Sequence, residues 1–461
     1  MTFVSVLIVV CLSTLAVLPT AVGWDANWES LDSRPLPSWY DKAKFGVFIH
    51  WGVFSVAGYD HTPWFWYWWL AGKVPSYQQY INDTEASARF AYQEYAERFD
   101  AALYDPEYWA DVFAGSGAQY VVLTSKHHEG FCNWDSRDVP ATANWNAMDI
   151  GPRRDLVGDL AAAIKNTTSP LTDRALRFGL YHSMLEFFNP ANLRDGANNW
   201  TTQEYVDLKA LPELYDLVNK YEPDLLWGDG TWSEPSAYWK SVEFLAWYST
   251  NSTVADEAVW NDRWGADCLS THGGFYTPAD RYDPGRLLEN KWEDALTINT
   301  NSWGYQKDTT IGDFMTTKKL IHTLIETVAF GGNLLVNVGP GPDGTLDPIL
   351  VDRLDGMGDS LAVNGEAIYD SQPWKHAQSE TDVSTFYTRK GRMLYAIFTE
   401  WPAGNVLNLR APTTVRKVFM LGLDGTLDWM MNDDGVHISI PPLTPDQVPC
   451  QHAWVLKIKH L

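Results

Sequence analysis

Asp229 is the carboxylate that the sequence places best for chemistry. It stands in the segment 225–230, LLWGDG, directly after a short apolar run and between two glycines. An Asp-Gly pair by itself most often marks a turn, but the run before it has the character of a buried strand. A carboxylate at the end of such a strand, with glycines leaving room beside it, could attack an electrophilic carbon of a ligand.

A second carboxylate would complete this chemistry. Cleavage of a glycosidic bond with retention uses one carboxylate as nucleophile and another as acid and then base. Asp280, in the segment PADR, and Glu293, in the segment KWE, are the two candidates. Both lie in a stretch rich in glycine and aromatic residues, and spacing alone does not decide between them. A plain salt-bridge role is the alternative for either.

Histidines follow two further apolar runs. His50 follows one, and His127-His128-Glu129 follows the other. Side chains of adjacent strand residues point to opposite faces, so we do not expect one metal bound by both His127 and His128. The chain contains neither a CxxC nor an HExxH motif. A neutral imidazole offers a donor and an acceptor for a hydroxyl, and we predict hydroxyl binding without a metal or cofactor. A buried structural role is the alternative for His50.

Aromatic residues are abundant and clustered. The chain contains 24 Trp in 461 residues, and residues 64–69 read Trp-Phe-Trp-Tyr-Trp-Trp. Six successive aromatic residues cannot all lie on the buried face of one helix, so some are expected to line a pocket or an interface. Flat aromatic rings stack on the C–H faces of pyranose rings, which indicates a sugar site, although packing accounts for most of them.

Short apolar runs alternate with longer mixed segments from residue 24 to residue 370. Two of these mixed segments, 211–221 and 316–330, are predicted helices. The alternation predicts a (β/α)8-like barrel; a doubly wound sheet is the alternative, which the lack of a Gly-rich phosphate loop weakens. Functional residues should then follow the strands, as they do here. The runs span 45–49, 120–123, 178–181, 225–227, 258–260 and 334–338.

The chain changes character after residue 370. Residues 392–399, 436–440 and 453–458 are strand-like, and Asp-Gly turns separate the segments. This pattern predicts an antiparallel β-sandwich over residues 371–461. The domain could support the barrel or contact sugar.

The N-terminus predicts entry into the secretory pathway. Residues 1–23 are interpreted as a signal peptide, although no Lys or Arg precedes the apolar run, and a retained membrane anchor is the alternative. Four N-x-S/T sequons are candidate glycosylation sites. We expect a lysosomal or secreted protein, free of the membrane once the signal is removed. The sequon residues are Asn82, Asn166, Asn199 and Asn251.

The net charge of the chain is −24, which argues against a nucleic-acid partner. Three cysteines remain after removal of the signal peptide, which leaves at least one of them unpaired within the chain.

Taken together, the motifs resemble the α-L-fucosidases of glycoside hydrolase family 29, in particular the animal-like tissue subgroup. The matching segments occur in the family's order and cover essentially the whole mature chain: WYDKAKFGVFIHWGVFSV, TSKHHEGF, GLYHSMLEFFNP, LLWGDGTW, NDRWG, GGNLLVNVGPGPDGT and VNGEAIYDSQPW. The resemblance implies a barrel with a C-terminal β-sandwich, and retaining exo-hydrolysis of terminal α-L-fucose from glycans or glycoproteins without a cofactor. A homo-oligomer is possible.

The resemblance also implies residue roles. Asp229 matches the family's nucleophile, Asp280 is the first choice for the acid/base, and Glu293 is the alternative. The residues that match positions contacting or lying near fucose are His50, Trp64, His127, His128, Tyr181, Trp227 and Arg263.

Pro63 departs from the family pattern. The family commonly has an acidic residue just before the aromatic run, whereas this chain reads Thr62-Pro63-Trp64. A hydrogen bond to a charged group contributes roughly 1.5–3 kcal/mol, so its loss could weaken fucose binding unless Asp60 or His61 substitutes. The alternatives are therefore a catalytically weakened fucose-binding homologue and a hydrolase of a related sugar.

Overall fold

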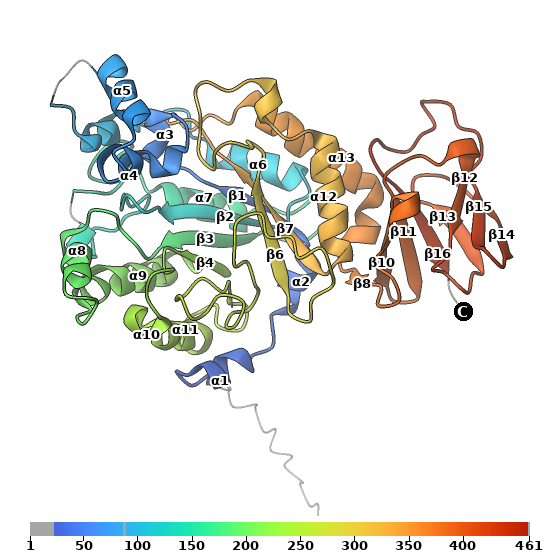
Figure 1. Ribbon diagram of the computed structural model, residues 1–461, viewed down its shortest axis with the longest axis horizontal. Helices are drawn as coiled ribbons and strands as arrows, with labels where there is room; N and C mark the ends of the chain where they lie inside the picture. Colours follow the sequence, from blue (N-terminus) through green and yellow to red (C-terminus); the bar gives the residue numbers. More distant parts are fainter. Residues whose placement is uncertain (1–22, 86–88, 143, 460–461) are drawn as a thin grey trace, which may run out of the picture.

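The computed structural model describes residues 23–85, 89–142 and 144–459. Residues 1–22, which carry most of the predicted signal peptide, lie outside the described residues. The chain forms a large α/β body and a smaller β domain, which sit side by side (Figure 1).

Seven parallel strands form the sheet of the α/β body. They lie in the order β5-β4-β3-β2-β1-β7-β6, and the sheet curls on itself as the predicted barrel does, with seven strands in place of eight. Six of them contain the six predicted runs, except that β5 lacks Ala258 of its run, whereas β6 was missed. The strands are β1 (Phe45–Ile49), β2 (Tyr120–Lys126), β3 (Arg177–Ser183), β4 (Leu225–Asp229), β5 (Val259–Trp260), β6 (Trp292–Thr297) and β7 (Gly332–Val338).

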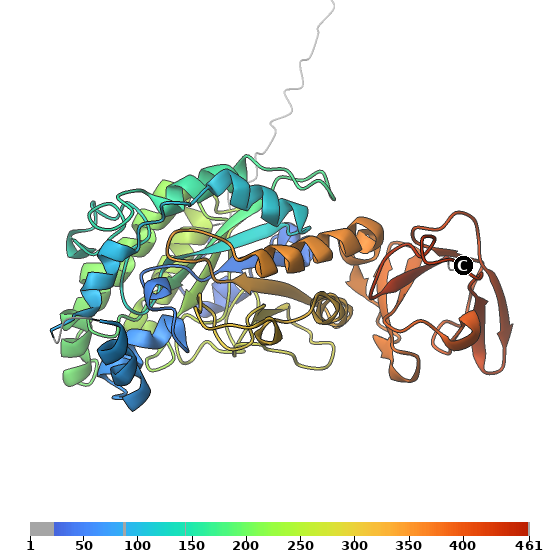
Figure 2. The same ribbon diagram turned by 90° about the horizontal axis from the view of Figure 1, so that it is seen from above.

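Helices surround the outer face of this sheet (Figure 2). The two predicted helices are confirmed as α9 and α12, and α12 begins after Thr316, whose side chain accepts from the Lys319 amide. The helices are α1 (Trp28–Asp32), α2 (Ser38–Ala43), α3 (Phe54–Ala57), α4 (Phe65–Leu70), α5 (Pro75–Thr84), α6 (Pro106–Gly115), α7 (Leu156–Lys165), α8 (Pro190–Ala197), α9 (Leu211–Tyr221), α10 (Ser236–Trp239), α11 (Ser241–Thr250), α12 (Thr317–Ala329) and α13 (Pro348–Ile368).

The strands are apolar on both faces because both faces are covered. Val47 and Leu226 pack outward against the helices, while their neighbours Phe48 and Trp227 pack inside the curled sheet with Tyr181. Successive strand residues point to opposite faces, so a strand buried on both sides lacks polar alternation. This explains the unbroken apolar runs of the sequence.

The barrel wall is open at one place. Strands β5 and β6 are the two edges of the sheet and do not pair with each other. The chain between them, residues 261–291, crosses this opening, and it is held to the edge of β6 by an isolated parallel bridge between Tyr276 and Trp292. The Arg281 amide also donates to the Ala295 carbonyl, with N and O 2.9 Å apart.

The C-terminal domain consists of two antiparallel sheets. One has the order β13-β16-β11-β10-β8, with β9 on β10, and the other has the order β12-β15-β14. Side chains such as Leu394, Leu409 and Ile438 fill the core between them. The strands are β8 (Gln372–Pro373), β9 (Ser379–Glu380), β10 (Thr385–Lys390), β11 (Met393–Phe398), β12 (Val406–Leu409), β13 (Lys417–Met420), β14 (Asp428–Asn432), β15 (Gly435–Ser439) and β16 (Trp454–Lys459).

This domain rests on helices α12 and α13. Tyr395 donates to the Glu366 carboxylate at 2.7 Å, and His322 contacts the backbone carbonyl of His452 at 2.8 Å. Val455 joins the core cluster of the α/β body. The contacts favour the supporting role over sugar contact for this domain.

The three cysteines that the structure describes are free, and the four sequon asparagines are all exposed. Within the described residues, no helix combines the length and the apolar character that a membrane crossing needs.

Candidate active site

A small cavity opens where the parallel strands end. Its volume is about 120 Å³, which is below the range of about 300–1,000 Å³ for pockets that hold drug-sized ligands and suits a single sugar ring. Every side chain predicted for the site except that of Glu293 lines it. The lining residues are Phe48, His50, Pro63, Trp64, His127, His128, Tyr181, Trp227, Asp229, Trp232, Arg263, Asp280 and Trp303.

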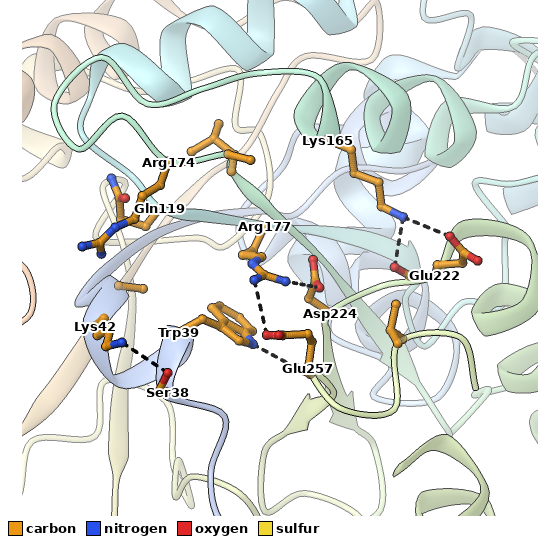
Figure 3. A pocket seen from close by; sticks show the side chains of 14 residues that line it. Ser38, Trp39, Lys42, Gln119, Lys165, Arg174, Arg177, Glu222, Asp224 and Glu257 are labelled. Atoms are coloured by element: carbon orange, nitrogen blue, oxygen red, sulfur yellow. Dashed lines mark hydrogen bonds and ion pairs between the residues drawn. The ribbon is translucent and has the colours of Figure 1, made fainter. Parts of the chain in front are cut away.

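A larger cavity, of about 640 Å³, lies at the opposite ends of the same strands (Figure 3). Its charged groups are engaged with the protein itself. The Arg177 guanidinium contacts the carboxylates of Asp224 at 2.8 Å and Glu257 at 3.3 Å, and Lys165 donates to the Glu222 carbonyl at 3.1 Å. Ligands of barrel enzymes bind at the carboxyl ends of the strands, so the smaller cavity is the candidate active site.

Asp229 is the last residue of β4, and three groups surround its carboxylate. The Tyr181 hydroxyl donates to Oδ2 at 2.8 Å, and Arg263 Nη1 lies 3.3 Å from Oδ1. His128 Nε2 lies 3.5 Å from Oδ2. Burial and the nearby Asp229 carboxylate raise the pKa of Tyr181 well above its ordinary value, so this hydroxyl stays protonated and acts as a donor.

The glycines beside Asp229 allow side chains of the protein itself to pack closely against the backbone. A Cβ on Gly228 would lie 2.9 Å from Trp264, and one on Gly230 would lie 2.8 Å from Leu185. Gly230 also has φ +82°, which disfavours other residues. The prediction that these glycines leave space for a ligand was therefore wrong.

Asp280 lies at the mouth of the cavity. Its side chain is 47% exposed, against 11% for Asp229. Arg263 bridges the two carboxylates, because its Nη2 lies 2.9 Å from Asp280 Oδ1 while Nη1 faces Asp229. Burial opposes the charge of Arg263, but the two carboxylates raise its pKa. The guanidinium also stacks over the Trp227 ring at 4.5 Å, which fixes its orientation.

Glu293 lies outside the cavity. It is the second residue of β6, near the start of the strand, and it is fully buried. Burial raises the pKa of its carboxyl. The Trp227 indole, which donates to Oε1 at 3.0 Å, stands between Glu293 and the cavity, and the hydroxyls of Tyr40 and Tyr120 donate to Oε2.

Two of the cavity histidines are held as neutral rings. His50 Nδ1 lies 2.8 Å from the Asn337 amide oxygen, and the Asn337 amide nitrogen donates to Thr297 and Trp303. Nδ1 therefore carries the proton, which leaves Nε2 as an acceptor. Burial lowers the pKa of His50 to about 3, and it lowers that of His128 well below its ordinary range.

His127 and His128 both line the cavity, with ring centroids 4.0 Å apart. The prediction that they point to opposite faces was wrong, because β2 ends at Lys126 and strand alternation ends with it. Among the described residues no group of three His, Cys, Asp or Glu side chains is arranged to hold a metal ion.

As predicted, the six successive aromatic residues at positions 64–69 do not all lie in the core. Trp64 lines the cavity, whereas Phe65 and Trp69 are buried in the core. Pro63 also lines the cavity, but neither Asp60 nor His61 does. Asp60 accepts from the Tyr77 hydroxyl, so the structure gives no sign that either residue replaces the missing carboxylate.

Sequence reasoning missed three aromatic residues as parts of the cavity wall, namely Phe48, Trp232 and Trp303. Phe48 lies two residues before His50 on β1, so strand periodicity could have identified it. Trp232 follows Asp229 by three residues, and Trp303 lies in the loop after β6. No local signal marks these two, because a loop residue has no fixed direction.

A buried ionic cluster stands behind the histidine loop. Lys126 lies 2.5 Å from Glu213 and 2.9 Å from Glu186, and Lys209 lies 3.0 Å from Glu213. His182 packs against the same cluster and faces away from the cavity, since its neighbour Tyr181 faces inward. Burial, aided by the charge of Lys126, lowers the pKa of His182 to about 4.

His182 makes stability depend on pH. Between about pH 4 and 6.5 the unfolded chain protonates this residue and the folded chain does not, so the free energy of unfolding falls as pH falls. We expect His182→Gln to reduce that slope near pH 5 by about 1 kcal/mol per pH unit, measured by urea unfolding. Above pH 7.5 the two slopes should coincide; parallel curves at pH 5 would contradict the assignment.

Comparison with known proteins is consistent with this geometry. A family model described as alpha-L-fucosidase matches residues 12–366, and one described as alpha-L-fucosidase C-terminal domain matches residues 378–459. The tissue alpha-L-fucosidase of Homo sapiens is 47% identical over 435 residues, covering 94% of this chain and 91% of that protein. The plasma alpha-L-fucosidase of Homo sapiens is 44% identical over 448 residues, covering 96% and 94%.

Solved structures of an alpha-fucosidase are also similar to this chain. The Thermotoga maritima alpha-fucosidase in complex with fucose has a TM-score of 0.78 and 31% identity, covering 94% of this chain and all of that one. The same enzyme with a mechanism-based inhibitor has a TM-score of 0.79 and 31% identity, covering 95% of this chain and all of that one.

Proposed function

This chain belongs to the α-L-fucosidase family, glycoside hydrolase family 29, and we propose that it removes terminal α-L-fucose from glycans or glycoproteins with retention of configuration. One observation carries the proposal. Two carboxylates, one buried at a strand end and one at the mouth, share a single arginine in a cavity of monosaccharide size.

In the first step Asp229 attacks C1 of the bound fucosyl residue. The bond from C1 to the leaving oxygen breaks, and the carboxylic acid of Asp280 gives its proton to that oxygen. The product is a fucosyl ester of Asp229. Tyr181 and Arg263 hold different oxygens of Asp229, which fixes the carboxylate for attack.

In the second step a water molecule enters the place of the leaving group. Asp280, now a carboxylate, takes a proton from this water while the water oxygen attacks C1 and the ester bond breaks. Asp229 is regenerated as a carboxylate. Two inversions at C1 give net retention.

The remaining cavity residues bind the sugar. Neutral His50 and His128 can accept from fucose hydroxyls, and His127 lies beside them. Trp64 and Trp227 line the same cavity and supply apolar surface beside the C–H groups of the ring. Loss of the acidic residue at Pro63 makes the remaining hydrogen-bonding residues more important for affinity.

We propose further that the protein works in the lysosome or outside the cell, as an N-glycosylated product of signal cleavage. The exposure of Asn82, Asn166, Asn199 and Asn251 supports glycosylation, and the relatives named tissue and plasma alpha-L-fucosidase support this location.

A panel of aryl glycosides tests the sugar preference. An aryl α-L-fucoside should be hydrolysed between pH 4 and 7, with α-L-fucose as the first product by NMR. The matching α-L-galactoside, which adds one hydroxyl at C6, should be cleaved with a kcat/KM about 100-fold lower, as expected when a hydroxyl enters an apolar site. Binding of fucose without hydrolysis at any pH, or faster cleavage of the galactoside, would contradict the proposal.

A further inference from the structure

Trp232 is an exposed aromatic residue at the mouth of the cavity. Its side chain is 45% exposed, whereas Phe48, Tyr181 and Trp227 at the base of the same cavity are 1–2% exposed. Because the exposed indole adjoins the cavity, a ligand that extends beyond the cavity would cover it. Asp280, the proposed proton donor, is the other strongly exposed residue of the lining.

Neighbouring rings hold the indole in place. The Trp232 ring stacks near Trp64 with centroids 6.0 Å apart and planes inclined by 25°, and it meets the His128 ring edge-on at 5.3 Å. Trp64 in turn stacks near Trp68 at 5.8 Å. Trp232 is thus the end of a row of three indoles, and its exposed area remains available to a ligand at the mouth.

The reaction places the leaving group at this mouth. The cavity holds one sugar ring above Asp229, and the leaving oxygen must lie beside Asp280, which is nearer to solvent. The sugar attached to that oxygen therefore extends toward the exposed part of the wall. A pyranose ring presents an apolar C–H face there, and an indole is the side chain that best covers such a face.

We propose that Trp232 forms the wall of the leaving-group subsite, where the sugar ring next to fucose packs on its exposed indole. The inference rests on the proposed function and specifies its substrate class, namely fucosides whose leaving group is itself a sugar ring. Water enters the same subsite in the second step.

Substrates with and without a leaving-group ring test the subsite. Wild-type protein and Trp232→Ala are compared on α-L-fucosyl fluoride, which has no such ring, and on the fucosyl disaccharide that the wild type cleaves fastest. The ratio of kcat/KM for the disaccharide to kcat/KM for the fluoride should fall about tenfold in the variant, as expected for loss of one stacking contact. Trp232→Phe should recover part of the ratio.

Trp68→Ala is the matched control. It removes an indole from the same row, but Trp68 does not line the cavity, so the ratio should stay at the wild-type value. An equal loss on both substrates, or an unchanged ratio in Trp232→Ala, would overturn the inference alone. A wild-type protein that does not hydrolyse the fluoride would overturn the proposed function, and the inference with it.

Discussion

Asp229→Ala lowers kcat on an aryl α-L-fucoside by roughly 10⁴- to 10⁶-fold, the range seen when a residue central to covalent catalysis is removed. Among the described residues that line the cavity, Asp280 is the only other carboxylate, and the proposed mechanism places it on the leaving-group side. Added azide should restore part of the turnover and form β-L-fucosyl azide, because a small anion can attack C1 from the face that Asp229 occupied.

Asp224→Ala is the control for loss of a buried aspartate. Asp224 immediately precedes β4, at the opposite end from Asp229, and pairs with Arg177. Its loss should lower stability and leave kcat of the folded protein unchanged. Wild-type-like turnover in a folded Asp229→Ala protein would remove Asp229 from the mechanism.

Asp280→Ala should slow the reaction to an extent that depends on the leaving group. Fucosides with sugar leaving groups need a proton, so their kcat/KM should fall about 10³-fold, within the usual contribution of general acid catalysis. A 2,4-dinitrophenyl fucoside, whose leaving group departs as an anion, should lose about tenfold or less. Azide should accelerate the second step and give α-L-fucosyl azide, since attack on the ester by an anion needs no base.

The variant Glu293→Gln tests which of the two carboxylates, Asp280 or Glu293, acts as the acid/base. Glu293 accepts from two tyrosine hydroxyls and the Trp227 indole, and an amide cannot accept all three. We expect the variant to lose about 1–3 kcal/mol of folding stability. Its kcat/KM should depend on the leaving group as that of the wild type does. If Glu293→Gln shows the steep dependence and Asp280→Ala does not, the assignment of Asp280 is wrong.

Much of the barrel could be predicted because its strands are buried on both faces. Runs such as Phe45–Ile49 and Gly332–Val338 contain few polar residues, and the polar residues that follow them mark the end of the sheet where ligands bind. Position in the barrel then identified Asp229 and His50 as cavity residues from local sequence alone.

Strand β6 could not be predicted in this way. Its sequence, WEDALT, has acidic residues at its second and third positions, and both are buried. The hydrogen bonds that compensate Glu293 come from Tyr40 and Tyr120, far away in the chain. Without that strand, Glu293 could not be assigned to the end of the barrel that lies away from the active-site cavity. Trp232 and Trp303 could not be predicted to line the cavity either, because the conformations of loops set the directions of their side chains.

The two proposed catalytic carboxylates differ in what holds them in place. Asp229 belongs to a strand paired on both sides, where a shift of one residue would turn its side chain to the opposite face. Asp280 belongs to the chain that crosses the opening between β5 and β6, where insertions and deletions change loop length without shifting the register of the seven-stranded sheet. Within this architecture, the nucleophile is fixed, whereas the proton donor can be supplied from a different position in a related sequence.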